Sequence, residues 1–209
     1  SKTGSIPYHP GARLVFSDGT PDILAYPRDR RGWGHLCRML TQANFRKVSD
    51  KGDPHLFLAD LIQWGDRMSL AILPDLDMPE QEALDLLGLL RGRFGRAIRL
   101  AAAPLYRGND RWRIEQATAL AAAAKMSLMA VNEVLYHAAE RQPLQDVVTA
   151  IRLGVPVCEA GYRLRANAER HIKPPAEMGQ IFRRSPEALS ETIRFASELE
   201  FSLSELEYN

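Results

Sequence analysis

Short apolar runs and longer amphipathic runs alternate along this chain, and their order predicts an α/β fold. The apolar runs at 13–16 and 23–26 flank SDGTPD, a segment dense in turn-forming residues, which predicts a β-hairpin. Apolar residues then recur at i, i+3, i+4 and i+7 starting from Trp33, the spacing of one helix face. Cys37 belongs to this face, so we expect it to be a small core residue. The polar stretch 44–54 predicts a loop.

Three further apolar runs, at 70–73, 98–103 and 128–131, predict buried strands in the middle of the chain. A helix that begins at Pro79 separates the first two runs, and a helix capped by Asp110 separates the second two. This β-α-β-α-β order is typical of parallel strands joined by right-handed crossovers. Three such strands predict an open or partial sheet and not a closed barrel.

The last third of the chain predicts helices. One helix is expected to end at Gly154, a residue type that often follows a helix C-terminus. Its predicted apolar face consists of Leu144, Val148 and Ile151. The sequence Ser185-Pro186-Glu187 predicts the start of the last helix. Its predicted apolar face consists of Leu189, Ile193 and Ala196.

Composition is that of an ordinary soluble domain and excludes several special classes. The 209 residues carry a net charge of +1, so the chain lacks the basic excess of a dedicated nucleic-acid binder. The two cysteines lie far apart, which suits neither a zinc site nor a disulfide framework. No apolar run reaches the ~20 residues of a membrane span, and no signal peptide is visible. We therefore expect a cytoplasmic protein without membrane contact.

The stretch 142–178 is the most informative for function because, with several other blocks, it resembles a known family. The quoted blocks resemble, in the same order, the PHP (polymerase and histidinol phosphatase) region of bacterial DNA polymerase III α-type polymerases. They fit best to the error-prone branch of that family. The blocks are ARLVFSDGTPDILAYPRDRRGWGHLCRMLT, KGDPHLFLADL, PLYRGNDRWRIEQATALAAAAKMSLMAVNEVLYH, RQPLQDVVTAIRLG, NAERHIKPPAEM and the ending SPEAL…ELEFSLSELEY.

The resemblance implies a fold and a division of the chain. We expect a partial PHP-type (β/α) barrel with parallel strands, an N-terminal β-hairpin and a helical C-terminal end. Residues 1–140 are then a truncated PHP α/β region, and residues 141–209 are the helical end that leads to the polymerase palm. Neither the HxH metal motif that opens such a region nor the palm itself is found in this sequence.

The resemblance also implies a candidate metal corner at Asn132–His137. In the family an intact corner resembles Asp-x-His, and these two side chains reach one divalent ion. Here Glu133 takes the place of the Asp, and Leu135 stands where the His is expected. Glu133 and His137 are therefore the candidate metal ligands of a degenerate motif. The alternative interpretation, which the departures favour, is that both are structural or surface residues.

Asp75 and Asp77, in PDLD, look like the PDxD motif with which polymerases of this family hold two catalytic Mg²⁺ ions. In the family, however, that motif lies in the palm. At this position the two acids precede Pro79 and so favour a helix entrance. No magnesium is therefore expected in this segment, and the Mg²⁺ belongs to the palm of the parent enzyme.

Basic and histidine residues offer further candidates. One basic group is expected to be a solvated helix end and an exposed strand edge, or alternatively a phosphate patch; it comprises Arg91, Arg93, Arg96 and Arg99. A second lies at a helix N-terminus and could hold an anion; it comprises Arg28, Arg30 and Arg31. His35 and His55 have no ligand partners at useful spacing, and the resemblance gives His171 a packing or junction role.

Three functions follow. The first is a non-catalytic PHP-region segment of an error-prone DNA-directed DNA polymerase that acts in damage-tolerant synthesis and repair. DNA and other polymerase domains or subunits would be its partners in the parent, and self-association is expected if apolar surface is exposed. The second is a metal-dependent PHP-type phosphoesterase. The third is a free-standing domain with an anion site at the carboxyl ends of its parallel strands.

Overall fold

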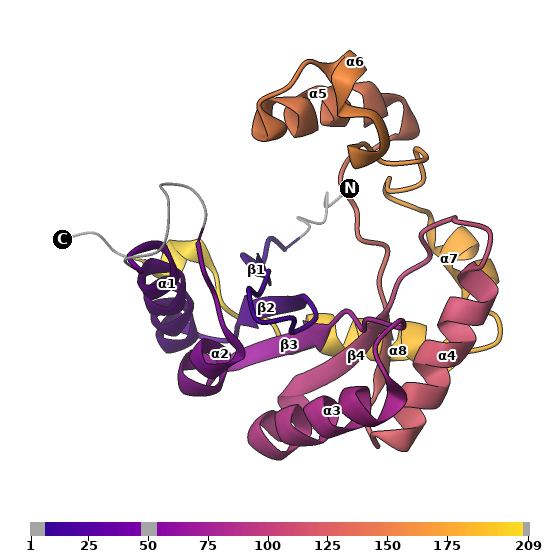
Figure 1. Ribbon diagram of the computed structural model, residues 1–209. Coiled ribbons are helices and arrows are strands. Elements are labelled where there is room, and N and C mark those ends of the chain that lie inside the picture. The colour runs from indigo at the N-terminus through magenta and orange to yellow at the C-terminus, as the bar shows by residue number, and fades with distance from the viewer. Residues whose placement is uncertain (1–6, 47–53, 207–209) are drawn as a thin grey trace, which may run out of the picture.

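A five-stranded sheet forms the centre of the protein (Figure 1). The computed structural model describes residues 7–46 and 54–206. The spatial order of the strands is the same as their order in the chain. They are β1 (Ala12–Leu14), β2 (Ile23–Pro27), β3 (Met68–Ile72), β4 (Ile98–Ala102) and β5 (Leu128–Ala130).

Strand directions confirm the hairpin and the parallel strands that the sequence predicts. β1 pairs with β2 antiparallel, and β2 pairs with β3 antiparallel. β3, β4 and β5 are parallel to one another, with Ile72 opposite Leu100 and Ala102 opposite Ala130. Only β2 therefore runs against the others. The sheet has two open edges and is not closed into a barrel.

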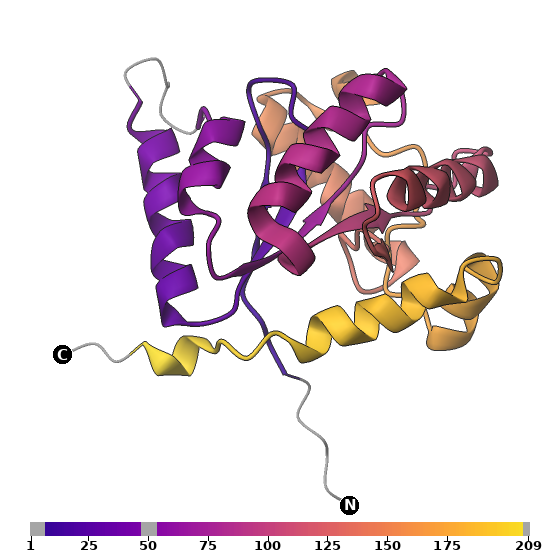
Figure 2. The same cartoon turned by 90° about the horizontal axis from the view of Figure 1, so that it is seen from below.

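Helices cover both faces of the sheet, because the side chains of its strands are apolar on both sides. Helices α1, α2, α3 and α4 share one core with residues such as Leu70 and Leu100. On the other face α8 packs on Ala71, Ala101 and Met129 through Phe195 and its neighbours, and it runs along the lower side of the molecule in Figure 2. The helices are α1 (Arg30–Asn44), α2 (Leu58–Trp64), α3 (Glu80–Phe94), α4 (Asp110–Ala123), α5 (Gln142–Leu153), α6 (Val157–Ala160), α7 (Pro175–Ile181) and α8 (Pro186–Ser197).

The expectation that Arg99 lies at an exposed strand edge is wrong. Arg99 is on β4, the fourth of five strands, and only 3% of the residue is exposed. Its Nε donates to Glu191 at 3.0 Å, and its Nη2 donates to Glu198. Burial opposes the charge, but the two carboxylates outweigh burial and raise the pKa of Arg99. This ionic contact holds α8 against the sheet.

The inner face of α8 also differs from the prediction. Ala188, Glu191 and Phe195 are buried, whereas Ile193 is 73% exposed. The prediction used only the positions of the apolar residues in the sequence. Glu191 can face inward because Arg99 neutralises it, and this contact sets the rotation of the helix.

Two further residues expected in the core are on the surface. Cys37 is exposed, because α1 buries Leu36 and Met39 instead. In α5, which ends at the left-handed Gly154 as predicted, Ile151 is 74% exposed. Figure 1 shows α5 and α6 standing away from the sheet. The predicted inner face of α5 is therefore an exposed apolar surface.

Two remaining expectations concern the loop and the membrane. Most of the predicted loop 44–54 lies outside the described residues. Among the residues that the structure describes, every helix is too short or too polar to cross a lipid bilayer.

Candidate anion-binding cleft

A cleft of about 390 Å³ opens at the carboxyl ends of the parallel strands. Leu73, Ala103 and Glu133, which follow shortly after β3, β4 and β5, all line it. In open α/β sheets ligands bind at this edge, because loops that leave neighbouring strands diverge there. The third of the predicted functions places its anion site at this edge.

Arginine dominates the charge of the cleft. Its cationic side chains are Arg13, Arg107, Arg113, Arg165 and Arg170. Its carboxylates are Asp22, Asp75 and Glu133. Five guanidinium groups against three carboxylates leave a formal charge of +2. Such a site favours an anion over a metal cation.

Glu133 is held between two of these arginines. Arg170 Nη2 donates to Glu133 Oε2, and Arg13 Nη1 lies 3.5 Å from Glu133 Oε1. The side chains of Glu133 and Arg170 are only 9% and 8% exposed. Glu133 also has a left-handed backbone with φ of 44°, which costs a non-glycine residue about 1–2 kcal/mol. The ion pair with Arg170 offsets this cost and directs the carboxylate into the cleft.

Glu133 does not satisfy all the hydrogen-bond donors of Arg170. Its Nη1 is buried and has no hydrogen-bond partner among the described residues. Burial, with the positive charges of Arg13 and Arg107, lowers the pKa of Arg170 to about 10. Burial of its guanidinium and the same two neighbours also lower the pKa of Arg165, although that residue is exposed as a whole. An anion in the cleft would relieve this repulsion.

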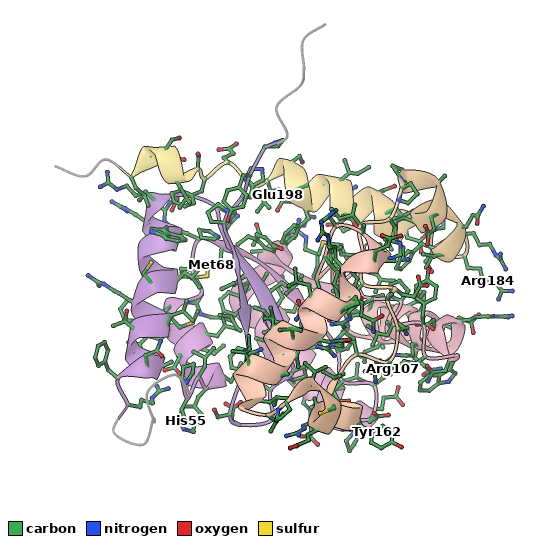
Figure 3. All side chains as sticks on the ribbon, turned by 90° about the horizontal axis from the view of Figure 1, so that it is seen from above. His55, Met68, Arg107, Tyr162, Arg184 and Glu198 are labelled. Carbon is green, nitrogen blue, oxygen red and sulfur yellow. The ribbon has the colours of Figure 1, made fainter. Side chains whose placement is uncertain are left out.

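The loop between β4 and α4 presents Arg107, which Figure 3 labels. Asp110 shapes this loop, because its carboxylate accepts the backbone N–H groups of Leu105, Tyr106 and Arg107 at 2.5, 2.8 and 3.0 Å. Asp110 is thus the first residue of α4, and its predicted role as the N-cap is wrong: Asn109 is the N-cap. Asn167 Nδ2 donates to two carbonyls of the same loop, at 3.1 and 3.0 Å.

The segment NAERHIKPP (167–175) therefore braces the carboxyl edge of the sheet. The Arg170 carbonyl accepts the N–H of Leu135 at 2.8 Å, and His171 forms a β-bridge with Tyr136. These contacts give His171 a packing role, one of the two roles that the resemblance implies. They also join the segment to the strand end that carries Glu133.

A group of three potential metal ligands occurs nearby. Ligand atoms of Glu169, His171 and Glu177 lie within 4.8 Å of one another. Lys173, whose side chain is 0% exposed, donates to Glu169 at 2.8 Å and lies 3.0 Å from Glu177. Burial opposes its charge, but these carboxylates outweigh burial and raise the pKa of Lys173. One ammonium group therefore pairs with both acids and balances one of their two negative charges.

Comparison with known proteins now identifies the family. No family model matches the chain. A protein of Mesorhizobium japonicum named error-prone DNA polymerase is 64% identical over 209 residues, all of this chain and 19% of that protein. The proteins of that name from Sinorhizobium medicae and Rhodopseudomonas palustris are 50% and 43% identical over 100% and 95% of this chain, which covers 18% of each. The chain belongs to the error-prone DNA polymerase family. It spans about a fifth of the length of these relatives.

The comparison confirms the resemblance to error-prone DNA polymerases, but the PHP assignment and the metal corner stay predictions. Glu133 binds Arg170 and Arg13, and His137 is exposed. Neither residue belongs to the group of three potential ligands found in the described part of the chain.

The remaining candidates of this error-prone DNA polymerase segment have structural partners. Asp75 Oδ1 accepts the N–H of Asp77 at 3.0 Å and so shapes the turn before α3. Asp29 caps the N-terminus of α1, where the basic loop could hold an anion: its carboxylate accepts Gly32 N–H at 2.8 Å. His35 Nδ1 lies 3.3 Å from the Asp66 carbonyl, and His55 Nδ1 lies 3.3 Å from Ser17 Oγ.

The sequence did not predict the arginine cleft as a site, although one of its hypotheses placed an anion site at the same edge of the sheet. Arg165 and Arg170 lie inside the stretch that identifies the family, yet no spacing rule marks them as binding residues. Arg13, Arg107 and Arg113 come from three other segments of the chain. Only the packing of the sheet edge brings these five side chains together.

Proposed function

We propose that this chain is a non-catalytic PHP-type region of an error-prone DNA polymerase that acts in damage-tolerant DNA synthesis. The parent enzyme adds deoxynucleotides to DNA with Mg²⁺ bound in a palm domain, in the bacterial cytoplasm. The similarity along the whole chain and the parallel strands after an N-terminal hairpin support this proposal. The arrangement suits a module that braces the polymerase and contacts its other parts.

The ion pair between Glu133 and Arg170 carries the non-catalytic part of the proposal. A divalent cation needs several carboxylate or imidazole ligands that are not already neutralised. Glu133 is the acid at the strand end where a metal corner is expected, and two guanidinium groups occupy it. In this cleft a cation would meet five arginines, whereas a phosphate-like anion would meet favourable partners.

Metal analysis tests the proposal. The purified chain is incubated with Mn²⁺ or Zn²⁺, dialysed, analysed for metal and assayed with p-nitrophenyl phosphate. We expect substoichiometric metal and no turnover. The alternative is a metal-dependent phosphoesterase, for which the group of Glu169, His171 and Glu177 is the observation in favour. Stoichiometric metal with turnover, both lost in His171→Ala, would establish that alternative.

Anion binding is tested separately, in EDTA, by calorimetric titration with inorganic phosphate. We expect binding that weakens about tenfold or more in Arg107→Gln or Arg165→Gln, because each removes a charged donor. Arg31→Gln is the matched control, since Arg31 is exposed on α1 and does not line the cleft. Equal affinities in all three variants would refute the anion site.

A further inference from the structure

A second basic groove, of about 840 Å³, lies at the opposite edge of the sheet. Ile98 at the start of β4 and Ser127 just before β5 both line it. Its cations are Arg91, Arg96, Arg99, Lys125 and Arg194. They come from the end of α3, the turn after it, β4, the turn before β5, and α8. Segments from five parts of the chain thus converge on one positively charged surface.

The four arginines that the sequence analysis grouped as one basic cluster do not lie together in the structure. Arg93 turns away: its guanidinium donates to Asp66 at 2.7 Å and to the Ile62 carbonyl at 3.1 Å. Arg91, Arg96 and Arg99 remain in the groove. The expectation of a solvated helix end therefore holds for only part of this cluster.

The acids of the groove are already neutralised. Glu191 accepts from Arg99 at 3.0 Å and from Arg194 at 2.5 Å, and Glu198 accepts from Arg99. Five cations against these two carboxylates leave a formal charge of +3. Arg99 is 97% buried, and its Nη1 has no hydrogen-bond partner among the described residues. A fixed cation with a free donor therefore lies at the base of the groove.

The shape and lining of the groove indicate the ligand. Gly88, Gly92 and Gly95 form part of one wall, and an added Cβ at any of them would meet nothing within 4 Å. The wall is thus open enough for a bulky polymer. Among the described residues, no aromatic side chain lines the groove, so these residues offer no platform on which the bases of a single strand could stack. Arg91, Arg96 and Lys125 are exposed cations, the kind of group that contacts phosphates.

We propose that this groove binds the phosphodiester backbone of duplex DNA without reading its sequence. The groove lies at the opposite edge of the sheet from the arginine cleft, so neither metal content nor phosphate binding in that cleft bears on it. This proposal rests on the proposed function and deepens it, because it gives the region a direct contact with DNA.

Fluorescence anisotropy of a labelled duplex tests the proposal. We compare the unaltered chain with the double variant Arg91→Gln/Arg96→Gln at several salt concentrations. If about three phosphates are contacted, log K falls with log salt at a slope of about −2.7. The double variant should lose about two units of that slope and bind at least about tenfold more weakly at low salt.

The control is Arg141→Gln/Arg152→Gln, which removes the same charge from exposed residues in and next to α5. It should bind as the unaltered chain does. The proposal is overturned if both double variants weaken binding equally, because net charge alone would then be responsible. It is also overturned if the unaltered chain does not bind duplex DNA at low salt, or if a single strand of equal length binds more tightly than the duplex.

Discussion

Glu133→Gln is the most informative single change in this protein. Glutamine has nearly the same shape as glutamate, so its side chain fills the same space at position 133. The change removes one negative charge from the buried pair with Arg170 and from the contact with Arg13. It therefore separates the electrostatic role of Glu133 from its packing role.

The expected cost follows from burial. Removing one partner of a buried ion pair costs about 3–5 kcal/mol, because the other charge stays buried and unpaired. Glutamine keeps an amide oxygen that can accept from Arg170, and Arg13 retains Asp22 at 2.6 Å. We therefore expect a loss of about 2–3 kcal/mol in the free energy of unfolding. For a domain of this size that lowers Tm by about 4–12 °C.

Phosphate should reverse part of this loss. The change raises the formal charge of the cleft from +2 to +3 and leaves more of the Arg170 guanidinium free for an anion. A ligand that binds only the folded state stabilises it by about 2.7 kcal/mol at one hundred times its Kd. Thermal unfolding at increasing phosphate should thus show a larger rise in Tm for Glu133→Gln than for the unaltered chain.

The control is Glu140→Gln, which removes a charge from an exposed residue. It should leave both Tm and its response to phosphate unchanged. Our reasoning is refuted if Glu133→Gln unfolds at the same temperature as the control. It is equally refuted if phosphate stabilises the two variants to the same extent.

Three further predictions concern stability and association. Gly32→Ala should destabilise the protein in urea titrations, because the new Cβ would lie 2.3 Å from the Arg67 carbonyl, whereas Gly34→Ala in the same helix meets nothing and should stabilise by up to about 1 kcal/mol. Burial opposes ionisation of Asp60, but hydrogen bonds from Arg46 outweigh it and lower the pKa of its carboxyl. The contribution of Asp60 is therefore present above about pH 4 and lost as pH falls through the lowered pKa, so Asp60→Asn should be less stable at pH 7 and match the unaltered chain in strong acid. Ile151→Asp should reduce self-association in light scattering, because Ile151 is 74% exposed on the apolar surface of α5.

Part of this structure follows from local sequence signals. The turn-rich segment between two β-type runs produced the hairpin of β1 and β2, and the alternation of strands and helices produced three parallel strands. Gly154 ends α5 in the left-handed conformation that the pattern predicts. Such signals act within one element or between neighbours, so they can be recognised without the fold.

The rotation of each helix about its own axis could not be predicted without the surface on which the helix packs. The burial of Glu191 on α8 depends on Arg99, a residue 92 positions away in the chain. Cys37 is exposed because β2 and α2 pack on other residues of α1. An apolar residue on a helix shows that a face exists, but the packed neighbour decides which side it contacts.

By itself, the sequence indicated the family, the order of the strands and of the longer helices, and a hypothesis for the edge of the sheet at which a ligand would bind. Only the tertiary structure decided what that edge carries. It placed Arg170 beside Glu133 and gathered arginines from separate segments into one cleft. It also turned Arg93 away from the second groove and buried Arg99 at the base of that groove. The physical reason is that Coulomb interactions depend on distance and burial, and both arise only when distant segments pack together.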